Sequence, residues 1–171
     1  MWQGVDPERL GSRLFPALAY APDDGLFLLE DKSLGFGFIC DPLSGGDRAV
    51  ADRLNVFLNQ EWPVDTLIQV SLWASPDIQG NLALLNARRS AGKAPECQHL
   101  VGNTLAFLQE GTMNPVDGAS GLLIRRCQVI VTVKLPLSKP QPSEAEFEQA
   151  RALRSSSLQS LGTIGLRPVP L

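Results

Sequence analysis

The sequence predicts an α+β fold, in which a mixed and mostly antiparallel sheet carries helices in the order β-β-α-β-α-α-β-α-(β). Apolar segments with the period of a strand alternate irregularly with segments whose apolar residues recur every three to four positions. The first two apolar runs are separated by only three polar residues, which indicates a hairpin rather than a crossover. The last segment carries two prolines, which exclude it from a central position in a sheet.

The predicted hairpin covers residues 25–30 (GLFLLE) and 34–40 (LGFGFIC). In its second strand Gly35 and Gly37 alternate with phenylalanines, so one face of this strand is bulky and the other is bare. We expect either a close neighbour on the bare face or a bend of the strand there.

The remaining elements follow from periodicity and from start and stop signals. Helices are predicted over residues 47–60, from Ser75 as N-cap to Gly92, over 96–110, and over 143–161. The last helix begins with a capping box formed by Ser143 and Glu146. Strands are predicted over residues 66–74 and 122–137, with an edge strand over 163–171.

The length of 171 residues suits one domain with a short extension. Prolines and glycines interrupt residues 1–24, which we interpret as an irregular N-terminal segment. Residues 25–171 are expected to form a single α+β domain.

Composition excludes several classes of protein. The net charge of −3 and the isoelectric point near 5.1 argue against a nucleic-acid-binding domain. Residues 1–85 carry a charge of −7 and residues 86–171 one of +4, which indicates two differently charged faces. The longest uncharged window has 13 residues, too short for a membrane helix, and the first residues do not resemble a signal peptide. We therefore expect a cytoplasmic protein.

The sequence contains no recognisable catalytic or metal-binding constellation. Three dispersed cysteines and one histidine are a poor basis for a disulfide framework or a metal site. Cys40 and Cys127 lie in predicted strands and are expected in the core, whereas Cys97 and His99 would point to different sides of a helix. The Gly-Lys pair at residues 92–93 lacks the rest of a phosphate-binding loop. Clustered carboxylates flank turns and a helix start, which explains them structurally.

Exposed apolar and basic groups are the remaining candidates for contacts. Trp73 and Gln69 share the second face of the strand over 66–74, where Trp73 either packs under a helix or meets a partner. The basic doublets at residues 88–89 and 125–126 are interpreted as solvated surface groups.

Several strings in their order and spacing resemble a known family. They are SLGFGF at 33–38, DPLSG at 41–45, IQVSLWASPDI at 68–78 and IVTVKLP at 130–136, followed by the helix over 143–161. Together they resemble the N-terminal region of the TraC-like ATPases of F-type conjugative transfer systems, in the VirB-type family of type IV secretion ATPases. The resemblance covers roughly residues 15 to 170.

The resemblance implies a large cytoplasmic protein, peripheral at the inner membrane. In that family the N-terminal domain docks to inner-membrane secretion subunits, and a C-terminal RecA-like domain hydrolyses ATP. This sequence departs from the family because it has no Walker motif, so we expect it to be the N-terminal fragment of such a protein. ATP and Mg²⁺ would then bind in the downstream domain, and no catalytic, cofactor-binding or metal-binding residue is expected here.

The expected partners are inner-membrane secretion subunits, the protein's own ATPase domain and further copies of the full-length protein, with no direct contact to nucleic acid. The candidate contact residues are Trp73, Gln69, Leu34, Phe36 and Phe38.

Two other functional classes stay open at this point. One is a small hydrolase with a site built from Asp77, His99 and a cysteine, and the other is a stand-alone adaptor. A nucleic-acid adaptor would use Arg88, Arg89, Arg125 and Arg126, and its binding would weaken with salt.

Overall fold

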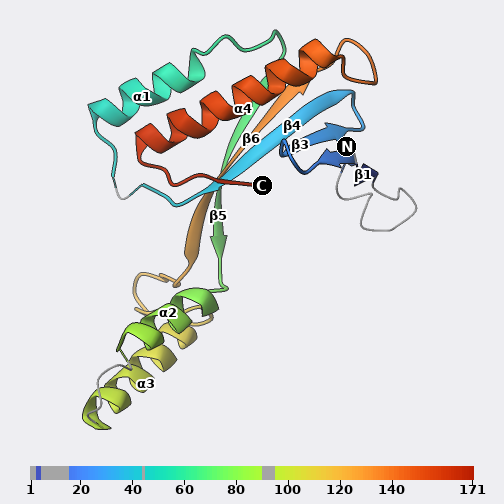
Figure 1. Ribbon diagram of the computed structural model, residues 1–171. Coiled ribbons are helices and arrows are strands. Elements are labelled where there is room, and N and C mark those ends of the chain that lie inside the picture. The colour runs from blue at the N-terminus through green and yellow to red at the C-terminus, as the bar shows by residue number, and fades with distance from the viewer. Residues whose placement is uncertain (1–2, 5–15, 44, 90–94) are drawn as a thin grey trace. The chain divides into compact units, whose positions relative to one another are not determined.

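The chain adopts the α+β fold that the sequence predicts (Figure 1). The structure, a computed structural model, describes residues 3–4, 16–43, 45–89 and 95–171. In these ranges the structure has four helices and seven strands. From β3 onward they follow the expected order, and the two strands before it, β1 and β2, were not predicted. The strands are β1 (Gln3–Gly4), β2 (Ala17–Ala21), β3 (Leu26–Leu29), β4 (Ser33–Cys40), β5 (Leu67–Ser75), β6 (Arg126–Pro136) and β7 (Val169–Pro170). The helices are α1 (Arg48–Leu58), α2 (Gln79–Arg89), α3 (Pro95–Glu110) and α4 (Glu144–Ile164).

Contacts divide the chain into two compact units. The sheet unit comprises Met1–Leu72 and Gln128–Leu171, and the helical unit comprises Trp73–Cys127. β5 leads the chain into the helical unit and β6 leads it back. That residues 25–171 fold as a single domain stays a prediction.

The strand order of the sheet is β1-β2-β3-β4-β6-β5, and β7 also pairs with β4. β4 is the centre of this arrangement, because it pairs antiparallel with β6 along its whole length. On its other side β3 covers the first half of β4, and β7 pairs with Phe38 and Ile39 farther along. The predicted hairpin is therefore confirmed. The strand predicted over residues 163–171 is confirmed only for Val169–Pro170, because α4 continues to Ile164.

The core of the sheet unit lies between one face of the sheet and the helices α1 and α4, which lie side by side over that face (Figure 1). β4 contributes Leu34, Phe36, Phe38 and Cys40, each at most 2% exposed. These side chains meet three similarly buried residues of β6 and the buried face of α4. Burial of each large apolar side chain stabilises the fold by about 1.5–3 kcal/mol.

Both helices of the sheet unit begin where the sequence signals predict. The side chain of Asp47 accepts a hydrogen bond from the backbone N–H of Val50 (2.9 Å) at the start of α1. Ser143 and Glu146 form the predicted capping box of α4. The carboxylate of Glu146 accepts hydrogen bonds from Ser138 and Ser143, which lower its pKa from 4.5 to about 2. Gly165 caps the C-terminal end of α4, and its φ of 100° places it in the left-handed region.

The helical unit differs from the prediction at both of its ends. Ser75 belongs to β5 rather than capping a helix, and α2 starts at Gln79, whose N–H donates to the carboxylate of Asp77. β6 starts at Arg126, so residues 122–125 lie outside the strand although the sequence predicted them to be part of it. There the N–H of Ile124 donates to the carbonyl of Gly111, which holds the segment against the end of α3.

The N-terminal segment also departs from the irregular structure expected for residues 1–24. Residues 17–21 form β2, which pairs antiparallel with β3. Ala17, Ala19 and Ala21 are buried, so a strand is present although its buried residues are too small to produce a strong hydrophobic signal.

Candidate functional site

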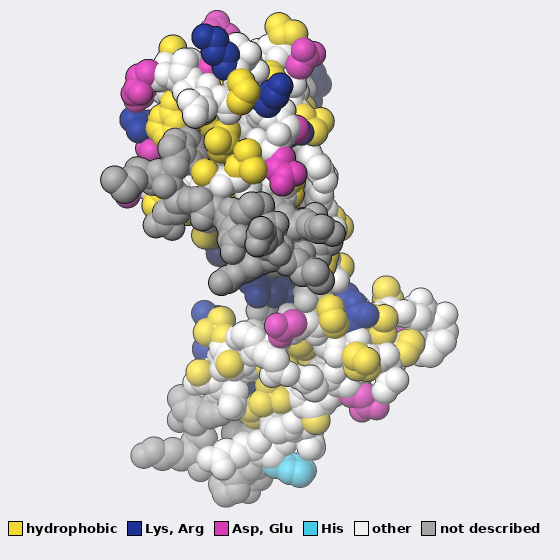
Figure 2. All heavy atoms as spheres, turned by 90° about the vertical axis from the view of Figure 1, so that its right-hand side faces the viewer, with side chains coloured by type: hydrophobic (Ala, Val, Ile, Leu, Met, Phe, Trp, Pro, Cys, Tyr) yellow, Lys and Arg dark blue, Asp and Glu magenta, His cyan; other side chains and the backbone are white. Residues whose placement is uncertain are grey.

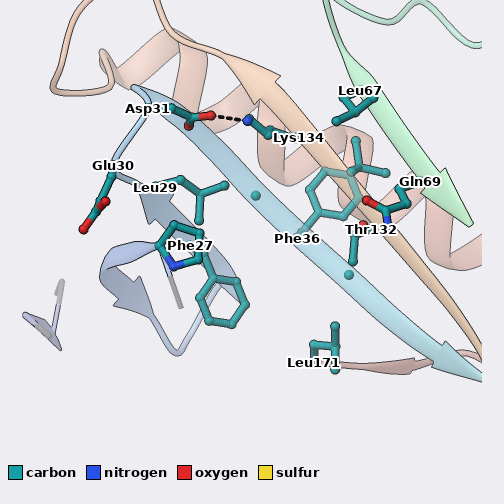
Figure 3. Close-up of a pocket in the computed structure, with 14 residues that line it drawn as sticks. Phe27, Leu29, Glu30, Asp31, Phe36, Leu67, Gln69, Thr132, Lys134 and Leu171 are labelled. Carbon is teal, nitrogen blue, oxygen red and sulfur yellow. Dashed lines mark ion pairs between the residues drawn. The ribbon is translucent and has the colours of Figure 1, made fainter. Parts of the chain in front are cut away.

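The face of the sheet opposite α1 and α4 carries a pocket of about 500 Å³ (Figure 3). Successive residues of a strand point to opposite faces, so the glycines of β4 lie on this side while its phenylalanines lie in the core. The pocket is lined by parts of β3, β4, β5, β6 and the C-terminal residues of the sheet unit. Its volume is within the range of ordinary ligand pockets.

Glycine forms the floor of this pocket. A Cβ atom added to Gly37 would lie 2.6 Å from Cδ1 of Leu171 and 3.1 Å from the carbonyl oxygen of Val131. A Cβ atom at Gly35 would lie 3.3 Å from Cδ1 of Leu29. The bare face of β4 therefore admits close neighbours, as the alternation of glycine and phenylalanine predicted.

The walls of the pocket are mostly apolar. Phe27 and Leu29 come from β3, Leu67 comes from β5, and Leu171 follows β7 (Figure 3). The Phe27 ring also stacks on Tyr20, with centroids 4.6 Å apart, so this wall is supported from β2.

One ion pair and one further carboxylate, that of Glu30, lie at the pocket. Lys134 forms an ion pair with Asp31, and Asp31 also accepts a hydrogen bond from the hydroxyl of Ser33 (2.5 Å). The hydrogen bond from Lys134 has the largest effect on the pKa of the Asp31 carboxyl and lowers it, and the hydrogen bond from Ser33 lowers it further. The side chain of Lys134 is 39% exposed and that of Asp31 is 49% exposed, so the ion pair contributes at most about 1 kcal/mol to stability. An apolar partner suits this pocket better than a strongly charged ligand.

The structure divides the predicted contact residues into two groups. Gln69 lines the pocket, and Trp73 is 57% exposed, which favours contact with a partner over the core alternative. Leu34 and Phe38 are fully buried in the core of the sheet unit, and their assignment as contact residues is wrong. Phe36 is 2% exposed and belongs to the same core, although it also borders the pocket. The alternation of residues in the sequence predicted which side chains share a face of β4. The face that was proposed to contact partners is the one that lies in the core.

The residues of the alternative hydrolase have separate local roles. Asp77 caps the start of α2, and His99 is exposed on α3, where its Nε2 lies 3.3 Å from the amide nitrogen of Asn103. Cys40 is buried as expected, and burial raises its pKa, whereas Cys127 is exposed and the expectation of a core position for it is wrong. The side chain of Cys97 lies outside the described part of the chain. No group of three or more His, Cys, Asp or Glu among the described side chains is arranged to hold a metal ion.

The basic doublets differ in their environment. Arg125 donates hydrogen bonds to the carbonyl oxygens of Thr112 (2.5 Å) and Ile124 (3.1 Å), so it supports the fold of the helical unit. Arg88 and Arg89 lie in the last turn of α2, where cations interact favourably with the helix dipole.

A family model described as TraC protein matches residues 12–171. The chain belongs to the TraC family. The resemblance found in the sequence is thereby confirmed, and it places this TraC chain among the proteins of conjugative transfer by type IV secretion. No curated protein and no solved structure matches the chain. None of the described helices of this TraC chain is long and apolar enough to cross a membrane.

The helical unit of this TraC chain presents many large apolar side chains at its surface (Figure 2). Those exposed by more than a third are Trp73, Leu84, Leu100, Phe107, Met113, Val116, Leu122 and Leu123. On α3, Leu100 is 65% exposed, whereas its neighbour Val101 is 9% exposed and occupies the buried position of that turn. The spacing of apolar residues in the sequence predicted the helix α3. It could not show how much of the apolar side of α3 would be covered by α2.

The structure also adds pocket residues that sequence reasoning missed. Thr132 and Lys134 face the pocket because they pair directly with Gly37 and Gly35. The alternation in the strand over 122–137 was a usable signal, but the register between β4 and β6 was needed to place these residues together.

Proposed function

We propose that this TraC domain is the docking and assembly domain of a conjugative-transfer ATPase. It contacts inner-membrane secretion subunits and the ATPase domain of the same protein, at the cytoplasmic side of the inner membrane. Hydrolysis of ATP with Mg²⁺ belongs to that other domain, and nucleic acid is not bound directly by this one. Pilus assembly and DNA transfer depend on it through these contacts.

The observation that carries the proposal is the exposed apolar surface of the helical unit. Leu100 and Phe107 are seven residues apart and therefore lie on the same side of α3, and large apolar side chains exposed on one side of a helix typically mark an interaction site. Leu100 is 65% exposed and Phe107 is 52% exposed on the same helix, α3. Large apolar side chains in the centre of an interface contribute most of its binding free energy.

The chemistry of the described residues supports contact rather than catalysis. A catalytic centre needs a nucleophile or base within hydrogen-bond reach of a positioned partner. In the helical unit the candidates Asp77 and His99 are instead engaged in a helix cap and a surface contact along α3. The pocket of the sheet unit is apolar with a neutralised ion pair, which suits an apolar side chain of a partner.

The proposal is tested by measuring binding to the inner-membrane subunits of the same transfer system in detergent or nanodiscs. Phe107→Lys and Leu100→Lys should each weaken binding by tenfold or more, because a charge would be buried in an apolar interface. Val56→Lys is the matched control, because Val56 is 68% exposed on α1 of the sheet unit. Equal affinity for all three variants and the unchanged chain would contradict a docking role of the helical unit.

A further inference from the structure

β5 is the outermost strand of the sheet beyond β6, and its outer edge meets no other strand in the described part of the chain. Its nine residues, Leu67–Ser75, include no charged residue, no proline and no glycine. The unpaired backbone groups of an edge strand attract other strands. Edge strands therefore usually carry charged residues, a proline or a bulge that prevents such pairing. An edge of this length without protection is therefore suited to pairing with another strand.

The side chains of β5 are exposed on both faces of the sheet. Leu67 is 55% exposed and Trp73 is 57% exposed on the pocket side. On the other side Val70 is 63% exposed and Leu72 is 70% exposed, although Ile68 of the same face packs against the core. The helices thus cover the start of this strand and leave its middle open.

The sequence of β5 is symmetric in polarity about Val70. When two copies of the strand run antiparallel with Val70 opposite Val70, polar residues face polar residues and apolar residues face apolar ones. The resulting pairs are Val70 with Val70, Gln69 with Ser71, Ile68 with Leu72 and Leu67 with Trp73. Cross-strand pairs of matched polarity stabilise a sheet, and apolar and β-branched pairs do so most strongly.

We propose that β5 pairs antiparallel with β5 of a second copy of this chain, with a two-fold axis at Val70. The pairing joins the two sheets into one continuous sheet and satisfies the open backbone groups of both edges. Identical strands that carried charge would repel each other in this arrangement, whereas β5 is uncharged. Because two paired strands form a small interface, we expect a dissociation constant on the order of micromolar.

This contact between copies goes beyond docking to secretion subunits and does not depend on it. A failed docking experiment would leave the self-association measurement unaffected, and the reverse also holds.

The first test is sedimentation velocity of the full chain over a concentration series from about 1 to 200 μM, a range that spans the expected dissociation constant. The unchanged chain should shift from monomer to dimer, and Val70→Lys should remain a monomer because two lysines would meet at the axis. Val56→Lys, at a position 68% exposed on α1, should dimerise like the unchanged chain. A chain that stays monomeric throughout overturns the proposal, and so does a dimer that Val70→Lys leaves intact.

The second test uses the fact that only a residue on the two-fold axis meets its own copy. Val70→Lys and Val70→Glu should each be monomeric alone, and an equimolar mixture should recover the dimer. Failure of the mixture to associate overturns the register, because opposite charges placed directly across two strands attract.

A third variant keeps the proposal testable if a charge at residue 70 impairs folding. Val70→Cys is made in a chain whose Cys40, Cys97 and Cys127 are replaced by alanine. Oxidation should give a disulfide-linked dimer for Val70→Cys and only monomer for Val56→Cys, because Cβ atoms of directly opposed residues lie about 4.5–5.5 Å apart. Equal cross-linking of the two variants would overturn the pairing.

Discussion

The sheet unit and the helical unit bury their apolar residues to very different degrees. In the sheet unit Leu26, Leu34 and Phe38 are 0% exposed, and the core continues through β6 and α4. In the helical unit the best-buried described apolar residues are Ile78 at 6%, and Leu82 and Val101 at 9%. The difference indicates that the sheet unit supplies the stability of the chain, while much of the apolar surface of the helical unit remains available for partners.

Truncation of a core residue in each unit gives the largest contrast. Phe38→Ala should lower the free energy of unfolding by about 3–5 kcal/mol, because it leaves a cavity in a closely packed core. Leu82→Ala should cost about 2 kcal/mol, at the low end for leucine, because its surroundings are thin. Urea unfolding followed by circular dichroism measures both losses.

The control for this pair is Leu84→Ala, at a position 54% exposed in α2, which should change stability by less than about 0.5 kcal/mol. Equal losses of stability for Phe38→Ala and Leu82→Ala would contradict the difference between the units.

Hydrogen exchange should show faster opening in α2 and α3 than in β4 and β6. A single coincident transition in all probes would support the expected single domain.

Alanine at a glycine should have opposite effects in the two units. Gly37→Ala places a Cβ atom 2.6 Å from Leu171 and 3.1 Å from a backbone oxygen, so it should cost about 1–3 kcal/mol and loosen β7. Gly80→Ala in α2 meets no atom within 4 Å and should stabilise the helix by up to about 1 kcal/mol. Thermal unfolding measures both as shifts of Tm. An unchanged Tm for Gly37→Ala would mean that the C-terminal residues leave β4 at no cost.

The smallest effect concerns the start of α4. Ser143→Ala should cost about 1 kcal/mol, because an N-cap acceptor is lost. The pKa of Glu146 is lowered from 4.5 to about 2, so its contribution to stability is fully present above about pH 5 and is lost as the pH falls through 4.5 toward 2. Glu146→Gln should reduce the loss of stability of the sheet unit over this range of pH.

Glu144→Gln is the control for the acid prediction, because it removes a charge from the same turn and leaves the capping box intact. Urea titrations at pH 2, 3, 4 and 6 would compare the variants. If Glu144→Gln and Glu146→Gln gave the same pH dependence, general charge rather than the capping box would control the acid response.

Local signals along the chain predicted most of the elements. The period of two with glycine at alternate positions predicted β4, and the capping box predicted the start of α4. β2 was missed because its buried residues are alanines, and residues 122–125 were read as strand because their apolar side chains do not reveal a loop. These errors occur where the hydrophobic pattern is weak or lacks a stop signal.

The candidate site was harder to predict than the fold. Gln69 and Trp73 are exposed and their contact with a partner stays a prediction, whereas Leu34 and Phe38 belong to the core. The pattern of β4 separates glycines from phenylalanines, but it cannot show which side the helices cover. Lys134 and Thr132 reached the pocket only through the register with β6.

Sequence order and local chemistry are thus sufficient for the α+β class, the family resemblance and the capping box of α4, because these depend on neighbouring residues. The tertiary structure was needed to show the buried face of β4, the closure of the pocket by Leu171 and the open edge of β5. These features join residues that are far apart in the chain. They depend on which strands pair and which faces the helices cover, and such long-range contacts leave little trace in local periodicity.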